Sequence, residues 1–438
     1  MTPFQRIAVA ALVLLGLTRC ALYSDVSIGP LVVAPAKLDR GSDVQSMVKK
    51  ADYLRALEMA VPIDGRIRKN AADLVSLGHA ELAAGRYDSA RKHLRAAIEL
   101  QPFRSTYGEA AWHLSQVEYM SNSFETSLEW ARTAVDNGIA ILPWHLQYLE
   151  ELATIPVYRF SGLPSDEMPL KIGRPDVPRV DVRVNRSATP VTAVIDSGAV
   201  LSIMSERMAS SLSVRRLRVS NGTFYGLLNE PIPVQFGVVD SLEIGAVVVE
   251  NVPIAIMPDE KMRFVVAGKR EFRIDFLLGA NLLKEFRIDL TFSRNRVSFT
   301  RLNASDRHPA QNQNLFFENF RPNVRATINK HGWYLFVLDT GSEITYLNQT
   351  RIAGLPINSF TPRVHSATLQ GLGGSKKRGS KVEKVEIGVD KWAGSFRTIP
   401  MYAAEEHERS VGIVGENFLK QFDVVLDFGR MRLDLKRW

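Results

Sequence analysis

Two segments of this sequence place a carboxylate, a hydroxyl group and a glycine next to one another: Asp196-Ser197-Gly198 and Asp339-Thr340-Gly341. Apolar, β-rich runs precede both aspartates, which predicts a strand that ends in a tight loop at each of them. Two carboxyls about 3 Å apart cannot both ionise, so they share one proton. Such a pair can activate a water molecule with one group and protonate the attacked group with the other. Hydrolysis without a metal or a covalent nucleophile is the chemistry that these segments predict.

The segments that flank the two aspartates occur twice along the chain, in the same order. VTAVIDSGAVLSIMS, which starts at Val191, aligns with YLFVLDTGSEITYLN, which starts at Tyr334. Farther on, LLGANLLKEFRIDLTFSRNRVSF aligns with IVGENFLKQFDVVLDFGRMRLDL, and between these landmarks LEIG aligns with VEIG. A single Asp-Thr-Gly is often a plain turn. Three landmarks in the same order predict two copies of one β-rich unit, over residues 178–302 and 316–438.

This duplicated arrangement resembles the aspartic protease family, both the two-lobed pepsin-like enzymes and the retropepsins that build one site from two identical chains. The segments LLG at 277–279 and IVG at 413–415 match the hydrophobic-hydrophobic-Gly segment that passes behind each catalytic loop. The resemblance implies an all-β, two-lobed acid-protease fold in which Asp196 and Asp339 are the catalytic pair. It also implies hydroxyl groups that hold the two loops and glycines that allow a close backbone approach: Ser197, Thr340, Gly198 and Gly341.

In this family a β-hairpin closes over the substrate, and each copy offers a candidate for it. In the first copy Tyr225 stands before Gly226 and resembles the pepsin-like flap tyrosine. In the second copy QGLGG, which contains Gly371 and Gly373, resembles the Gly-rich flap of the retropepsins. The resemblance implies that these residues contact the substrate. An ordinary aromatic residue of a hairpin is the alternative interpretation of Tyr225.

The composition limits the classes of ligand. The chain has a net charge of +8, and its basic residues are scattered except for SKKRGSK at 375–381. This cluster favours acidic substrates or an anionic membrane surface, or it is a solvated hairpin tip. No zinc-finger or RNA-binding signature accompanies the charge, so we expect no nucleic-acid partner. The sequence has no H-E-x-x-H pair and only one cysteine, so we expect neither a metal nor a cofactor.

Residues 42–153 carry a helical pattern, because apolar residues recur there at helical spacing. In the segment 71–102, small residues such as Gly78 and Ala90 let two helices approach closely, and this pattern resembles a tetratricopeptide repeat. Glu81 departs from the pattern at a position where an aromatic residue is usual. The resemblance implies an all-α repeat domain that binds a protein or peptide partner. A helical spacer without a ligand is the alternative.

The N-terminus has the features of an export signal. A positive charge at Arg6 is followed by an apolar run over residues 7–17, which is too short for a membrane span. Cys20, the only cysteine, comes shortly after this run, and the stretch resembles a bacterial lipoprotein signal in which the thiol is lipidated. Arg19 departs from that pattern. We therefore expect an exported, periplasmic, membrane-anchored lipoprotein; simple secretion, an uncleaved anchor or an incidental buried cysteine are the alternatives.

Together these features predict a multidomain chain with a signal over residues 1–20, a helical repeat domain over 42–153 and two protease lobes over 178–302 and 316–438. The expected function is an aspartic endopeptidase that cleaves protein or peptide substrates, with the helices binding a partner. One alternative is a catalytically inactive binding or scaffolding protein of the cell envelope. Another is that each lobe forms half of a site with a second chain. Retention of both aspartates favours the enzyme, and the fused repeat disfavours the half-sites.

Overall fold

We analysed a computed structural model of the whole chain. The structure describes these residues: 26–33, 43–59, 70–173, 176–225, 231–266, 270–353, 355, 365–370, 376–402 and 409–438. Two compact units divide them, a helical unit of residues 43–157 and 217–222 and a β unit of residues 26–33, 158–216 and 223–438. The predictions for Cys20, Gly226, Gly371 and Gly373 lie outside the described residues.

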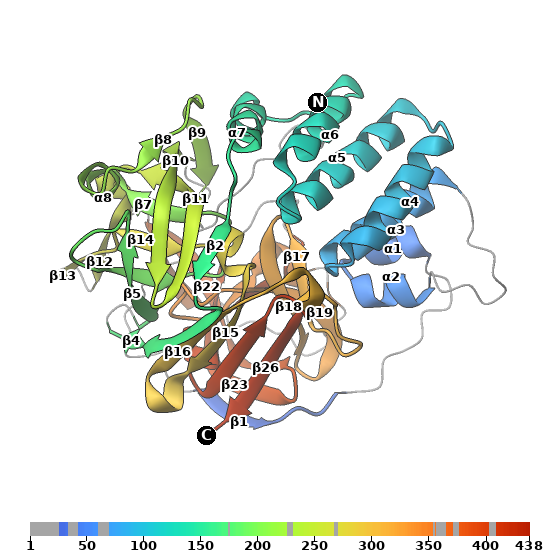
Figure 1. Cartoon of the computed structure of the whole chain (residues 1–438). Helices are drawn as coiled ribbons and strands as arrows, with labels where there is room; N and C mark the ends of the chain where they lie inside the picture. Colours follow the sequence, from blue (N-terminus) through green and yellow to red (C-terminus); the bar gives the residue numbers. More distant parts are fainter. Residues whose placement is uncertain are drawn as a thin grey trace. The chain divides into compact units, whose positions relative to one another are not determined.

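The helical unit is a run of short helices in which consecutive members pack against one another (Figure 1). Their bounds are α1 Val44–Lys49, α2 Tyr53–Met59, α3 Ala71–Ala83, α4 Tyr87–Glu99, α5 Arg104–Met120, α6 Phe124–Asp136 and α7 Pro143–Ala153. The side chain of Asn70 caps α3 by accepting the N–H of Asp73 at 2.7 Å. The predicted helical region is confirmed.

Helices α3 and α4 approach closely because a glycine lies between them. A Cβ on Gly78 would lie 2.5 Å from Leu94 Cγ, so a larger residue would push the helices apart. Glu81, which departs from the repeat pattern, is buried, and its Oε2 lies 2.8 Å from Nδ1 of His93 on α4. Burial raises the pKa of Glu81, while His93 opposes that change. The unusual acid is thus accommodated by an ionisable partner on the next helix.

The β unit contains two large sheets, each built on one copy of the repeat. The sheet of the first copy, here the first lobe, has the order β2-β11-β7-β14-β6-β5-β10-β8, with β4 paired to β5 and β9 to β10. Its strands are β2 Arg159–Gly162, β4 Lys171–Ile172, β5 Pro178–Val184, β6 Val191–Ile195, β7 Ser202–Ser205, β8 Arg215–Arg216, β9 Gly222–Tyr225, β10 Pro231–Ile244, β11 Val247–Met257 and β14 Phe276–Leu278. A separate hairpin, β12 Arg263–Val266 and β13 Arg270–Arg273, and the helices α8 Glu206–Ser211 and α9 Ala280–Leu283 complete it.

The second lobe repeats this arrangement around the second aspartate. Its sheet has the order β1-β23-β20-β24-β19-β18-β22-β21, with β17 paired to β18. The strands are β1 Val26–Pro30, β17 Leu315–Glu318, β18 Arg321–Ile328, β19 His331–Leu338, β20 Tyr346–Asn348, β21 His365–Gln370, β22 Lys376–Val389, β23 Trp392–Tyr402 and β24 Gly412–Val414. Short helices follow β20 and β24, namely α10 Gln349–Ile352 and α11 Glu416–Leu419. The central order β7-β14-β6-β5 of the first lobe corresponds to β20-β24-β19-β18 of the second.

A third sheet takes strands from both lobes. Its order is β26-β25-β15-β16-β3, and its bounds are β3 Ser165–Pro169, β15 Phe286–Thr291, β16 Arg296–Arg301, β25 Phe422–Asp427 and β26 Arg432–Arg437. The lobes meet where β15 pairs with β25 in antiparallel register, with Asp289 opposite Val425. Every second residue of both strands is buried, as expected for strands that cover a core on one face. This sheet joins the two copies through backbone hydrogen bonds.

Strands also occur in segments for which the sequence analysis predicted none. Residues 159–172, between the predicted helical domain and the first lobe, form β2, β3 and β4, which pair with β11, β16 and β5. Near the N-terminus, β1 pairs with β23 of the second lobe. The β unit therefore includes chain on the N-terminal side of residue 178. A β-rich region after a helical region is confirmed.

Candidate active site

Each aspartate directly follows a strand inside its own sheet. Asp196 follows β6, which lies between β5 and the parallel strand β14, and its N–H donates to the carbonyl oxygen of Leu278 at 3.0 Å. Asp339 follows β19, which lies between β18 and the parallel strand β24, and its N–H donates to the carbonyl oxygen of Val414 at 3.1 Å. The strands that contain the predicted LLG and IVG segments thus fix the backbone of both loops.

The two loops bring Asp196 and Asp339 together. A Cβ on Gly198 would lie 2.3 Å from Cγ of Asp339, and a Cβ on Gly341 would lie 2.3 Å from Cγ of Asp196. Any side chain at either glycine would therefore collide with the carboxyl of the other lobe. A glycine at each position thus permits the close approach of the two loops.

Each carboxyl is held on one oxygen and left without a donor on the other. Oδ1 of Asp196 accepts the N–H groups of Gly198 and Ala199, both at 3.0 Å, and Oδ1 of Asp339 accepts the N–H of Gly341 at 2.9 Å. Both Oδ2 atoms are buried, and outside the pair itself no described residue donates a hydrogen bond to them. The backbone fixes the orientation of both groups, and two oxygens stay available for chemistry.

Ser197 and Thr340 cross-link the two loops. The Ser197 hydroxyl donates to the carbonyl oxygen of Leu338 at 2.7 Å and accepts the N–H of Thr340 at 3.1 Å. The Thr340 hydroxyl donates to the carbonyl oxygen of Ile195 at 2.6 Å and accepts the N–H of Ser197 at 3.0 Å. Both side chains are fully buried. This reciprocal network ties the base of one loop to the base of the other.

Two asparagines, one in each lobe, hold the chain that follows the two loops. The sequence analysis assigned them no role. Oδ1 of Asn281 accepts the N–H of Ser202 at 2.7 Å, and Oδ1 of Asn417 accepts the N–H of Thr345 at 2.8 Å. The hydroxyls of Ser202 and Thr345 bond the same oxygens, at 3.1 and 2.8 Å. Both asparagines recur in register in the repeat, which was the signal that could have identified them.

The environment of the pair favours protonated carboxyls. Burial raises the pKa of Asp196 to about 7. The hydrogen bonds from two backbone N–H groups and from Asp339 lower this pKa, but less than burial raises it. Burial and the charge of Asp196 raise the pKa of Asp339 well above its usual value, while the N–H of Gly341 and the cation of Arg321 lower it. A coupled pair of this kind loses its protons in two steps that belong to the pair. The two carboxyls therefore titrate as one unit.

Two buried glutamates of the second lobe lie beyond the loop and were not singled out from the sequence. Oε1 of Glu343 accepts the N–H of Asp176 at 2.6 Å, and the Asp176 carboxylate forms an ion pair with Lys420. Burial raises the pKa of Glu343, and it raises that of Glu416 well above its usual value. The corresponding residues of the first lobe in the repeat are Val200 and Ala280. The two lobes therefore share their backbone design and differ in charge.

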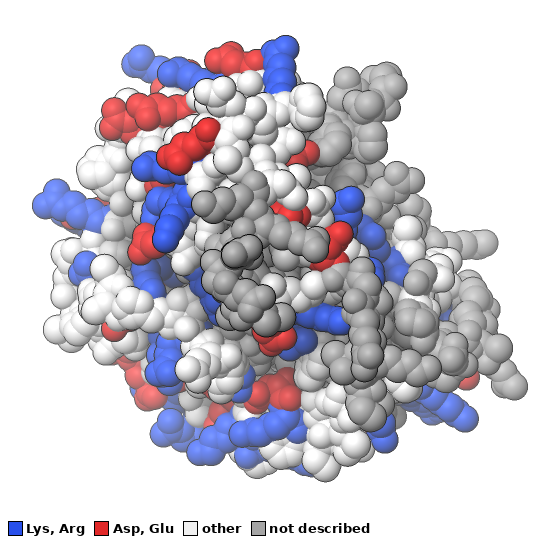
Figure 2. All heavy atoms as spheres, turned by 90° about the vertical axis from the view of Figure 1, so that its right-hand side faces the viewer, with Lys and Arg blue, Asp and Glu red and all other residues white. Residues whose placement is uncertain are grey.

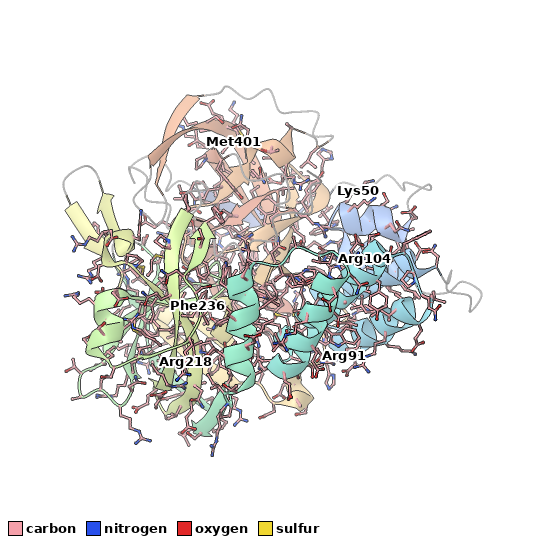
Figure 3. All side chains as sticks on the ribbon, turned by 90° about the horizontal axis from the view of Figure 1, so that it is seen from above. Lys50, Arg91, Arg104, Arg218, Phe236 and Met401 are labelled. Atoms are coloured by element: carbon pink, nitrogen blue, oxygen red, sulfur yellow. The ribbon has the colours of Figure 1, made fainter. Side chains whose placement is uncertain are left out.

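Of the predicted flap residues, only Tyr225 lies in the described part of the chain. Tyr225 is half-buried at the end of β9, which pairs with β10, and the rings of Phe224 and Phe236 pack edge to face at 6.1 Å between these strands (Figure 3, where Phe236 is labelled). No hydrogen bond among the described residues joins Tyr225 to Asp196 or Asp339. In the second lobe β21 pairs with β22, with Gln370 opposite Lys376.

Other kinds of site find little support in the described part of the chain. No group of three or more His, Cys, Asp or Glu side chains there could hold a metal ion. None of the helices in the described ranges is long and apolar enough to cross a membrane. On the face that Figure 2 shows, acidic and basic side chains are interspersed among the residues drawn in colour or white. The paired aspartates are the strongest candidate for a site.

Comparison with known proteins finds a family match over part of the first lobe. Residues 180–282 match the family model described as Aspartyl protease. Similar solved structures include a retropepsin-like aspartic protease from Rickettsia conorii, with 16% identity, a TM-score of 0.21 and coverage of 33% of this chain and 96% of that one. They also include an aspartic proteinase from Irpex lacteus, with 12% identity, a TM-score of 0.36 and coverage of 62% of this chain and 97% of that one.

Basic 7S globulin from soybean is also similar, with 14% identity, a TM-score of 0.36 and coverage of 64% of this chain and 95% of the globulin. No curated protein sequence matches the chain. The family match includes Asp196 and the loop around it, and the duplicated site geometry extends the same pattern to Asp339. Residues 180–282 of this chain thus match an aspartyl protease domain.

Proposed function

We propose that this protein is an aspartic endopeptidase whose catalytic groups are Asp196 and Asp339. The observation that carries the proposal is the pair of buried carboxyls, each aimed by its own loop, with the loops joined through Ser197 and Thr340. Paired carboxyls with a shared proton supply a base and an acid at the same pH. Peptide hydrolysis requires both.

In the proposed reaction a water molecule lies between the two Oδ2 atoms. The ionised carboxylate takes a proton from this water as its oxygen attacks the carbonyl carbon of the peptide, and the protonated carboxyl gives its proton to the carbonyl oxygen. The tetrahedral intermediate then breaks its C–N bond: the carboxyl that took the water proton gives it to the leaving nitrogen, and the other, now ionised, takes a proton from a hydroxyl of the intermediate, which becomes the new carboxyl group of the product. The fixed Oδ1 contacts keep both groups oriented through these steps.

Cleavage of unfolded casein by the purified full-length protein tests this proposal. We expect cleavage at acidic to neutral pH, inhibition by the transition-state analogue pepstatin, and loss of cleavage in Asp196→Asn and in Asp339→Asn. The double variant should be scarcely worse than either single variant, because groups that act as a unit are strongly non-additive. Asp240→Asn, at an exposed residue paired with Arg215, is the matched control and should keep activity. Activity that persists in Asp196→Asn would show that the lobes do not share one site.

The second candidate is a binding or scaffolding protein that keeps this fold without turnover. The complete burial of both aspartates favours it, because a peptide reaches them only if the groups that cover them move. Under this hypothesis casein stays intact, while pepstatin or a peptide still binds and raises the melting temperature. Retention of both aspartates and both hydroxyl neighbours favours the enzyme, since a protein without turnover could lose any of them.

For the helical unit we propose tetratricopeptide-like repeats that bind a protein partner. The aromatic residues that open α2, α4 and α6 support it: Tyr53 and Tyr87 lie one 34-residue period apart, and Phe124 follows at a longer interval. The same helices bury small residues at equivalent positions, among them Ala56 and Ala90. For the N-terminus we propose lipidation at Cys20 and anchoring at the periplasmic face of a membrane.

A further inference from the structure

The strand pairing of the second lobe, extended beyond its last paired residues, puts a buried arginine at the register position opposite Asp339. In the antiparallel ladder of β18 and β19, Asn323 is opposite Val337. Continuing that register by two residues on each strand places Arg321 opposite Asp339. Residues opposite each other in such a ladder project from the same face, with Cβ atoms about 5 Å apart. The guanidinium group thus originates on the same face as the carboxyl.

The first lobe has no charge at the equivalent place. In the ladder of β5 and β6, Arg179 is opposite Val194. Continuing that register by two residues on each strand places Val177 opposite Asp196. Val177 is fully buried and apolar. At this position a valine in the first lobe therefore corresponds to an arginine in the second.

Arg321 is a fully buried cation, with an exposed fraction of 1%. Buried charges are rare in proteins. On the neighbouring strand β17 the buried Glu318 is opposite Arg321, and Glu318 Oε1 lies 3.7 Å from Nε of Arg409. The charged groups that act on Asp339 are Asp196 and Arg321.

We propose that Arg321 is a positioning residue of the active site, whose buried cation lowers the pH at which the Asp196–Asp339 pair first ionises. A fixed positive charge near two carboxyls favours their first ionisation, because it offsets the cost of placing a negative charge in a buried site. The effect requires no hydrogen bond to the carboxyl. Outside the pair itself no described residue donates a hydrogen bond to Oδ2 of Asp339, so Arg321 does not occupy this oxygen.

This asymmetry gives the second lobe a particular task in the proposed reaction. A base must be ionised before it can deprotonate water, so the cation extends the active range toward lower pH. Glu343 and Glu416 lie on the same lobe, but their charges interact with Asp176 and Lys420, not with the pair. Arg321 is thus the positive charge that the described structure directs at the pair. The inference rests on the proposed function of Asp196 and Asp339. Its test must therefore distinguish a failure of the inference from a failure of the proposed function.

Carbon-13 NMR titration of the aspartate carboxyls in the full-length protein gives that separation, because it needs no turnover. The signals of the pair are assigned with Asp196→Asn and Asp339→Asn. In Arg321→Met we expect the first ionisation of the pair to move up by about one pH unit or more, the shift typical of losing an opposite charge at close range. Arg321→Lys should restore most of the original titration.

Arg325→Met is the matched control, since it removes the same charge from the same strand. The Arg325 guanidinium lies 4.7 Å from the centre of the Trp333 ring, and Arg325 is opposite Leu335 in the β18–β19 ladder, not at the position opposite Asp339. Its titration should equal that of the unmodified protein. If Arg321→Met does not fold, Arg321→Gln keeps a polar side chain without the charge and should move the titration in the same direction. An unmoved first ionisation in a folded, uncharged variant at this position overturns the inference.

The casein assay then distinguishes the two proposals. If the NMR titration moves and the unmodified protein cleaves nothing, the proposed function fails while the inference about Arg321 stands. If the protein is active and the acidic limb of the pH profile of kcat/KM is the same in Arg321→Met as in the unmodified protein, the inference about Arg321 fails while the proposed function stands. The expected result is a limb that moves to higher pH together with the NMR titration.

Discussion

Replacing one carboxyl of the pair should stabilise the folded protein, and the gain should depend on pH. Asp196→Asn keeps an oxygen for the N–H groups of Gly198 and Ala199 and removes a charge from a buried site. The amide group that replaces the carboxyl faces Asp339 without repulsion. Most substitutions of buried polar residues destabilise a protein, so a stabilising effect is a demanding prediction.

The size of the gain follows from the pKa of Asp196. Burial raises that pKa to about 7, whereas the unfolded chain has a pKa of about 3.9. A folded-state pKa above the unfolded one means that ionisation costs folding free energy, and each unit of difference costs about 1.4 kcal/mol. Below about pH 4 the group is protonated in both states and the cost is absent. The cost grows between the two pKa values and reaches roughly 4 kcal/mol above neutrality.

Urea unfolding measured at several pH values between these limits tests this reasoning. We expect the free energy of unfolding of Asp196→Asn to exceed that of the unmodified protein by a few kcal/mol above neutrality. Near pH 4 the two curves should converge, because the carboxyl is then neutral. Asp240→Asn, at an exposed carboxylate, should give a small difference that changes little with pH. A difference that stays constant from acidic to neutral pH, or a loss of stability at high pH, would refute the buried, raised pKa.

Three further changes test other parts of the site and the chain. Thr340→Val leaves the N–H of Ser197 and the carbonyl of Ile195 without their partner, so we expect the free energy of unfolding in urea to fall by roughly 2–4 kcal/mol. Ser115→Ala in the helical unit is the comparison and should lower it only a little. An unchanged unfolding midpoint in Thr340→Val would contradict the hydrogen-bond network. Cys20→Ser should release the protein from the membrane fraction or block its processing, whereas unchanged fractionation would exclude a lipid anchor. A chain of residues 158–438 should aggregate less than a chain that starts at residue 178, because both lack β1 and only the first keeps β2, β3 and β4 on the edges that these strands cover; equal solubility of the two chains would contradict this.

The sequence located the two aspartates because the chain repeats itself around them. A duplicated pattern of strand, loop and apolar segment specifies which strand must lie beside which, and β14 and β24 indeed flank the loops. The hydroxyls beside the aspartates could be assigned by the same symmetry. Their roles as catalytic and supporting groups stay predictions, since activity decides them.

Other features were not accessible from the sequence for physical reasons. The position of Arg321 opposite Asp339 depends on strand register, and register is a property of two segments and not of one. Strand β3 lies in a stretch rich in Pro and Asp, where local preference opposes a strand and pairing with β16 overrides it. Glu81 departs from the helical repeat pattern on its own and is explained by His93, a residue twelve positions away on another helix.

The pairing of β15 with β25 has a symmetry of its own. When the two copies are aligned through Phe286 and Phe422, each strand meets the equivalent of itself, and the centre of that pairing is Asp289 opposite Val425. Such a self-complementary edge would let either lobe associate with a second copy of itself. Two first lobes would then place Asp289 directly against its own duplicate, and like charges directly opposite destabilise a sheet. The valine in the other copy removes that conflict, so the sheet edge itself selects the unlike partner within one chain over a like partner from another.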